Sequence, residues 1–186
     1  MPSFDWKWKI SEAVDRLRSR YDLIGRNTGA PFLALIYPPE TEKAFEGEWH
    51  TVAMTLAPDF EVINIDVLKC TSEIIAEIGA ENITSALADP MPGSDPSSDL
   101  AARWISRIAE AIRQAAAARR NPIVVLHRLA SLDPVAGPRD LMQSLWDNPK
   151  SLDFPVVVLI PGHLSGARTY SFLGQREEFM YRGDLL

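Results

Sequence analysis

Residues 154–162 read FPVVVLIPG, in which five consecutive apolar side chains, Val156 to Ile160, stand between two prolines. An apolar run of this length, bounded by residues that interrupt regular structure, is typical of a strand covered on both of its faces. Three similar runs lie earlier in the chain, at residues 32–37, 62–66 and 123–126. Four such strands require helices on both faces of the sheet that they form.

Helical patterns alternate with these apolar runs. Helices are predicted over residues 40–56, 68–78, 81–87, 99–120 and 138–146, and Asp5 or Ser11 is expected to cap a further helix that carries Val14, Leu17, Tyr21 and Ile24. The alternation predicts an α/β fold with three layers, in which a mainly parallel sheet has helices on both faces. Residues 88–98, rich in proline, glycine and serine, are expected to form a mobile loop within a single domain spanning residues 1–186.

Length and composition fit a globular protein. The chain has 186 residues, of which 46% are hydrophobic and 24% charged, and roughly 150 residues is usual for one domain. No apolar run approaches the length of about 20 residues that spans a bilayer, and the first residues lack the apolar stretch of a signal peptide. We therefore expect a cytoplasmic protein with no membrane contact.

Charge is distributed unevenly along the chain. Residues 40–99 contain 13 acidic residues against two lysines, a balance of −11, whereas the whole chain has a net charge of −6. The acidic segment would repel a phosphate backbone. It is interpreted as a solvated face, with a docking patch for a basic partner as the alternative.

The segment after the last apolar run is similar to a phosphate-binding loop, GxxxxGK[ST]. Gly162, Arg168 and Thr169 lie at the expected offsets, but Ala167 replaces the second glycine and arginine replaces the lysine. An ordinary turn that closes the strand is favoured, with nucleotide binding as the alternative. Asp66, the one acid placed like a magnesium ligand at a strand end, is expected to cap the helix that follows it.

No catalytic constellation, cofactor site or metal site is predicted. His50, His127 and His163 are far apart in the sequence and fit no metal-binding spacing. Cys70 is the single cysteine, which excludes an internal disulfide and a cysteine-cluster zinc site, and it is expected to be a small buried hydrophobic residue.

Arginines of the longest predicted helix offer a second alternative, which is direct contact with nucleic acid. The arginines in question are Arg103, Arg107, Arg113, Arg119 and Arg120. A solvated helix face is favoured, because basic residues near the end of a helix also complement its dipole. In the tail, residues 179–186 are predicted to add an edge strand, and Tyr181 and Arg182 are either partner contacts or packed on the core.

Several segments in order resemble the motifs of the BrxB family, small components of the BREX bacteriophage-exclusion systems. The segments are residues 31–37 (PFLALIY), 63–68 (INIDVL), 132–134 (LDP) with 139–141 (RDL), 154–162, 172–174 (FLG), and Tyr181 with Arg182. The chain departs from the family at Arg128 and Ala130, where glycines are usual, and at Met180, where the family has a paired tyrosine.

The resemblance implies a non-catalytic cytoplasmic component with a degenerate P-loop-ATPase-like core. It also implies that the chain acts alongside PglZ, an alkaline-phosphatase-like protein. A DNA methyltransferase and a large ATPase are expected in the same neighbourhood. We therefore expect an adaptor that binds a PglZ-like protein and other BREX components, with Tyr181 and Arg182 as candidate contacts. Nucleotide binding and direct DNA binding remain the alternatives.

Overall fold

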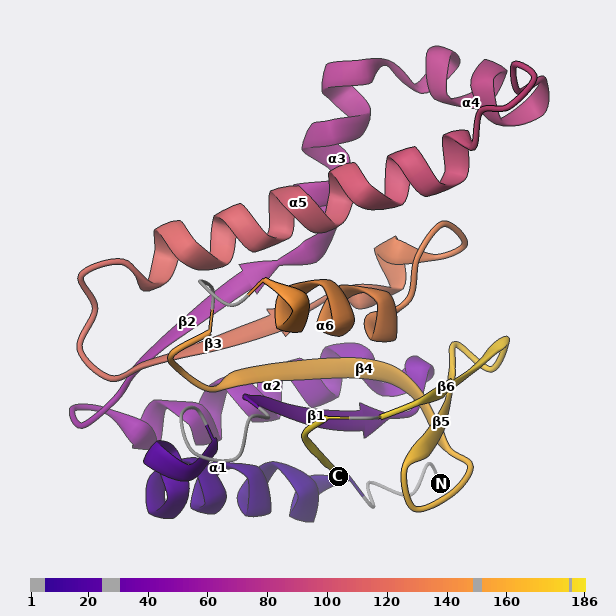
Figure 1. Cartoon of the computed structure of the whole chain (residues 1–186). Coiled ribbons are helices and arrows are strands. Elements are labelled where there is room, and N and C mark those ends of the chain that lie inside the picture. The colour runs from indigo at the N-terminus through magenta and orange to yellow at the C-terminus, as the bar shows by residue number, and fades with distance from the viewer. Residues whose placement is uncertain (1–5, 25–30, 149–151, 181) are drawn as a thin grey trace.

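A sheet of parallel strands forms the centre of the computed structural model, which describes residues 6–24, 31–148, 152–180 and 182–186 (Figure 1). The strand order is β2-β3-β4-β1-β7, and every neighbouring pair in it is parallel. The strands are β1 (Phe32–Tyr37), β2 (Glu61–Asp66), β3 (Pro122–His127), β4 (Val156–Leu164) and β7 (Asp184–Leu185). The predicted α/β fold with a mainly parallel sheet is confirmed.

Helices cover both faces of this sheet, so the predicted three layers are present. One face packs against α1 (Lys7–Asp22) and α2 (Glu42–Ala53). The other packs against α3 (Val67–Ile78), α5 (Pro96–Ala116) and α6 (Pro138–Asp147). Short 3-10 helices, η2 (Pro39–Thr41), η3 (Met54–Leu56) and η4 (Leu129–Leu132), complete the connections.

Strand β1 shows why its sequence is continuously apolar. All six of its residues are buried. Phe32, Ala34 and Ile36 belong to the core cluster beneath α5 and α6, and the intervening residues belong to the cluster beneath α1 and α2. Because successive side chains of a strand point to opposite faces, a strand covered on both sides has no polar position.

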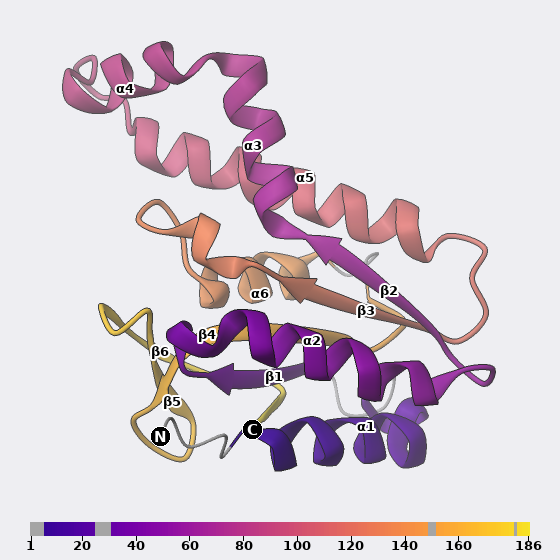
Figure 2. The same ribbon diagram turned by 180° about the vertical axis from the view of Figure 1, so that it is seen from behind.

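A helical arm, residues 79–95, projects beyond the edge of the sheet (Figures 1 and 2). Gly79, with a φ of +92°, ends α3 and redirects the chain into α4 (Ala80–Ala88). No residue of α4 is buried, although Ile83 packs against the core. The arm carries three acidic residues and no basic residue.

The boundaries of several elements differ from the sequence predictions. Helix α5 begins at Pro96, where the Asp95 side chain accepts a 3.0 Å hydrogen bond from the Ser98 N–H, and it ends at Ala116 rather than near residue 120. The segment between α4 and α5 is therefore shorter than the loop predicted over residues 88–98. Ser11 lies inside α1 and does not cap it, and Asp5 is outside the described residues.

Strand β4 also continues past its predicted end at Ile160. Pro161 is the last residue of β4 that pairs with β1, and from Gly162 the strand pairs instead with β5 (Thr169–Phe172). Strand β6 (Arg176–Phe179) then pairs with β5, and both pairings are antiparallel. The predicted edge strand in the tail is confirmed as β7. No helix in the described part of the chain combines the length and the apolar character needed to cross a membrane.

Candidate functional site

The carboxyl ends of the parallel strands, where ligands bind in sheets of this class, carry paired charges. Asp66, at the end of β2, caps α3 by accepting a 3.3 Å hydrogen bond from the Lys69 N–H, as predicted. Its other carboxylate oxygen lies 3.1 Å from the guanidinium of Arg128. On β3, His127 Nδ1 lies 3.1 Å from Oε1 of Glu46. These side chains join elements of the fold to one another.

The three residues of the possible phosphate loop lie in the β4–β5 hairpin. Gly162 is inside β4 and Thr169 begins β5. A phosphate-binding loop instead leads from a strand into a helix, whose first N–H groups bind the phosphates. The Arg168 guanidinium donates hydrogen bonds to the carbonyl oxygens of Met180 (2.9 Å) and Gly183 (3.3 Å). This geometry differs from that of a phosphate-binding loop, and Arg168 instead holds the C-terminal segment of the chain.

The arginines of the possible nucleic-acid surface are largely paired with carboxylates. Arg107 contacts Glu73 at 3.1 Å and Glu77 at 2.7 Å, and thereby ties α5 to α3. The other ion pairs are Arg113 with Glu110 and Arg119 with Glu61. Arg119 and Arg120 follow the end of α5, so they do not share a helix face with Arg103. The five arginines do not form one basic stripe of the kind that tracks a phosphate backbone.

An aromatic and basic surface lies where the C-terminal segment meets α6. The Arg182 guanidinium lies 4.3 Å from the centroid of the Trp146 ring, in a cation–π contact. Beside this pair is a cavity of about 220 Å³, lined by Phe32, Arg139, Met142, Gln143, Trp146, Phe179, Met180 and Arg182. The Phe179 side chain is 42% exposed. We call these residues the Trp146–Arg182 surface; Tyr181, the other predicted contact, lies outside the described residues.

A buried carboxylate, that of Glu178, connects the strand that carries Phe179 to α6. Glu178 is buried on β6 next to Phe179, and its Oε2 accepts hydrogen bonds from the Tyr170 hydroxyl (2.6 Å) and the Arg139 N–H (2.9 Å). Burial raises the pKa of Glu178, and it also raises the pKa of Tyr170, whose hydroxyl faces that carboxylate. The network fixes the β5–β6 hairpin against the first turn of α6.

Sequence reasoning singled out Arg182 but missed Trp146, the ring that its guanidinium contacts within the fold. Trp146 and Arg182 are far apart in sequence, and no local pattern connects a residue at the end of α6 with one in the tail. Glu178 was missed for a similar reason, because its burial follows from the contact between β6 and α6.

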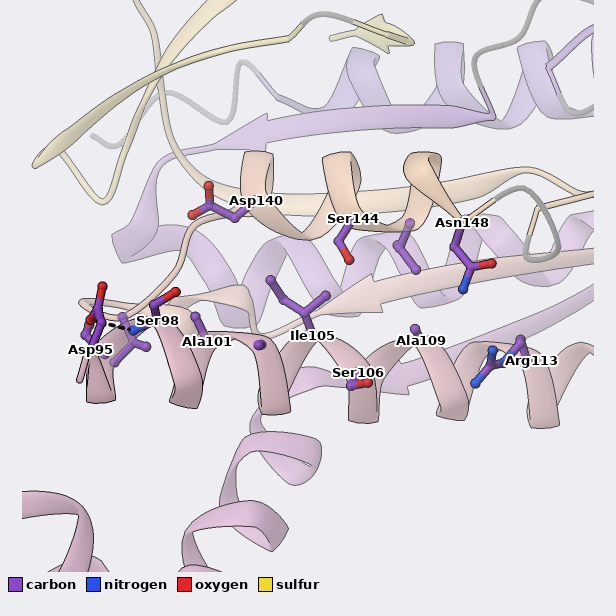
Figure 3. A pocket seen from close by; sticks show the side chains of 14 residues that line it. Asp95, Ser98, Ala101, Ile105, Ser106, Ala109, Arg113, Asp140, Ser144 and Asn148 are labelled. Atoms are coloured by element: carbon purple, nitrogen blue, oxygen red, sulfur yellow. Dashed lines mark hydrogen bonds between the residues drawn. The ribbon is translucent and has the colours of Figure 1, made fainter. Parts of the chain in front are cut away.

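A groove between α5 and α6 has a volume of about 640 Å³ (Figure 3). Its α5 side consists mainly of small side chains, among them Ala101 and Ala109. The charged side chains at its ends already have partners in the fold. Asp95 caps α5, Asp140 accepts a 2.8 Å hydrogen bond from the Gly137 N–H, and Arg113 pairs with Glu110. The groove therefore offers space without an arranged set of reactive groups.

Metal-ligating side chains do not converge within the described part of the chain, where no group of three or more His, Cys, Asp or Glu residues could hold an ion. His50 and His163 are exposed on α2 and β4. Cys70 is buried on α3, as expected. Comparisons with protein-family models, curated proteins and solved structures gave no match. The choice of function therefore depends on the residues of the chain itself.

Proposed function

We propose that the chain is a non-catalytic, cytoplasmic component of a BREX-type antiphage defence system, an adaptor that binds a PglZ-like protein and helps to assemble or regulate the defence complex. The ordered motifs that resemble the BrxB family support this proposal. The structural observation that carries it is the Trp146–Arg182 surface, in which an arginine stacks on a tryptophan beside an exposed phenylalanine.

The composition of this surface is typical of a protein-binding centre. Tryptophan, arginine and other aromatic residues are enriched among the residues that contribute most to binding between proteins. The cavity beside Trp146 could admit a side chain of the partner, and Arg139 and Gln143 supply polar groups at its rim. Such a centre, surrounded by polar groups, excludes water from the contacts that hold the complex together.

The surface is also preorganised. Arg168 fixes the backbone at Met180 and at Gly183 by donating hydrogen bonds to their carbonyl oxygens. Glu178 holds the hairpin against α6. Ordering these segments in the free protein lowers the entropic cost of binding a partner.

In this proposal, the parallel sheet is an ATPase-like scaffold that has lost its nucleotide motifs. The turn after β1, which leads into α2 in the manner of a phosphate loop, contains Pro38, Pro39 and Glu40 in place of glycines and a lysine. Pro38 and Pro39 have no backbone N–H groups to donate to a phosphate.

Co-expression with a PglZ-like protein encoded nearby tests the proposal. We expect the two proteins to elute together in size-exclusion chromatography, and we expect Arg182→Glu, or Phe179→Ser, to separate them. Arg103→Glu is the matched control, because it makes the same charge change on α5 and should leave the complex intact. Thermal unfolding of each variant alone shows whether it is folded. Separate elution of the unaltered proteins would contradict PglZ binding, and co-elution of both variants would exclude this surface.

A further inference from the structure

Strand β2 forms one edge of the sheet and pairs with a strand on one side only, as far as the described residues show. The Glu61 N–H donates a 3.3 Å hydrogen bond to the carbonyl of Asn121, so the backbone of Glu61 faces β3. Because backbone direction alternates along a strand, Ile63 and Ile65 also face β3. The N–H and C=O groups of Val62 and Asn64 therefore point outward from the sheet.

This edge lacks three of the features that commonly prevent a further strand from adding to it. Proteins use lysine, proline and bulges, among other means, to protect edge strands. Residues 61–66 of β2 contain neither lysine nor proline, and their pairing with β3 runs without a bulge over all six residues. Asn64, near the middle of the strand, is exposed.

A groove with an apolar lining runs beside β2 on the α2 face of the sheet. It has a volume of about 390 Å³, and its lining includes Trp49, Ala53, Met54, Phe60 and Val62. The Met54 side chain is 65% exposed. An added strand would direct every second side chain toward this groove, and apolar side chains would fit there.

A different groove, of about 500 Å³, runs beside β2 on the α5 face. Charged and polar side chains dominate its lining, among them Asp66, Lys69, Glu73, Arg107 and Glu110. The alternate side chains of an added strand would meet this charged surface. An added strand in which apolar and polar residues alternate would therefore fit both grooves.

We infer that the free edge of β2 binds an extended, basic segment of a partner protein, which adds to the sheet as a further strand with its apolar side chains toward α2 and its basic side chains toward α5. Charge complementarity determines the choice of occupant. Strand β2 itself carries Glu61 and Asp66 and no basic residue, and the lining of the groove on the α5 face has three carboxylates against two basic side chains. A second copy of the chain would bring two such segments together, and like charges would oppose the pairing.

A heptapeptide of alternating lysine and valine is a suitable probe, with amide hydrogen exchange measured by NMR. We expect peptide binding to slow exchange at the amides of Val62 and Asn64 by about tenfold or more. Exchange at Ile63, whose amide already faces β3, should change little. A control peptide with the same residues in block order, lysines before valines, has the same charge but not the alternation, and it should give no such protection.

Two matched substitutions complete the test. Met54→Ser removes an exposed apolar side chain from the groove and should weaken peptide binding about fivefold, since burial of apolar surface stabilises the complex. Met91→Ser makes the same change on the helical arm, at a side chain that is 76% exposed, and should leave binding unchanged. Unprotected Val62 and Asn64 amides at millimolar peptide would overturn the inference. Equal binding of the block-order peptide, or an equal effect of both substitutions, would also overturn it.

Discussion

The Tyr170 hydroxyl on β5 donates a 2.6 Å hydrogen bond to Oε2 of Glu178 on the neighbouring strand β6. Both side chains are buried, and the same carboxylate oxygen accepts the Arg139 N–H at the start of α6. A carboxylate withdrawn from water in this way is stabilised by its donors but disfavoured by burial, and burial is the larger effect.

The raised pKa of Glu178 makes stability depend on pH. In the unfolded chain the carboxyl has its ordinary pKa of 4.5, so between that value and the raised pKa the folded protein binds more protons than the unfolded chain. Stability therefore falls as pH rises through this window. Glu178→Gln should flatten this decline, as measured by urea unfolding at a series of pH values. Glu177→Gln changes an exposed neighbour and should leave it intact; an unaltered slope in Glu178→Gln would contradict the assignment.

Gly162 offers a test of the hairpin geometry. A Cβ atom at this position would lie 2.3 Å from the carbonyl oxygen of Ser171, so Gly162→Ala forces β4 and β5 apart. We expect a loss of about 1–3 kcal/mol in the free energy of unfolding. Gly47→Ala is the matched control on α2, where an added Cβ would meet nothing within 4 Å and alanine favours the helix by about 0.5–1 kcal/mol. In chemical denaturation, we expect the two substitutions to change the free energy of unfolding in opposite directions. Equal stability of the two variants would contradict the hairpin geometry at Gly162.

The order and type of most elements could be predicted because the pattern that specifies them is local. The apolar runs of β1 and β4 are long enough to identify strands covered on both faces, and Gly79 marks the end of α3. Asp66 was correctly identified as a helix cap, because a capping residue and its N–H donor lie within one turn of each other.

The features that could not be predicted depend on contacts between distant segments. Gly162, Arg168 and Thr169 have the spacing of a phosphate loop, but β5 pairs with β4 and makes that segment a hairpin. From the sequence, Arg107 is expected to be solvated. The fold places Glu73 and Glu77 of α3 beside its guanidinium. The Trp146–Arg182 surface likewise forms only when the tail folds back beside α6.

Substitution of Arg168 tests whether the β4–β5 hairpin has a structural role or binds a nucleotide. Because its guanidinium binds the carbonyl oxygens of Met180 and Gly183, Arg168→Ala should release the C-terminal segment and increase amide exchange in β7. The unaltered protein should show no thermal shift with millimolar ATP and magnesium. A nucleotide at 100 times its Kd would stabilise the fold by about 2.7 kcal/mol, so a clear shift that Arg168→Ala abolishes would support the nucleotide-binding alternative.

The reactivity of the Cys70 thiol depends on its burial and on the charged side chains near it. Burial raises the pKa of its thiol, and the nearby carboxylates of Glu73 and Asp66 raise it further. Since the thiolate is the reactive form, alkylation by iodoacetamide should be slower than that of a free cysteine at the same pH. As Cys70 is the single cysteine, mass spectrometry follows this reaction directly. Glu73→Gln removes one of the negative charges and should move the midpoint of the pH–rate profile down. Glu81→Gln makes the same change on the helical arm and should leave the midpoint where it is; an equal displacement in both variants would show that Glu73 has no specific effect on the thiol.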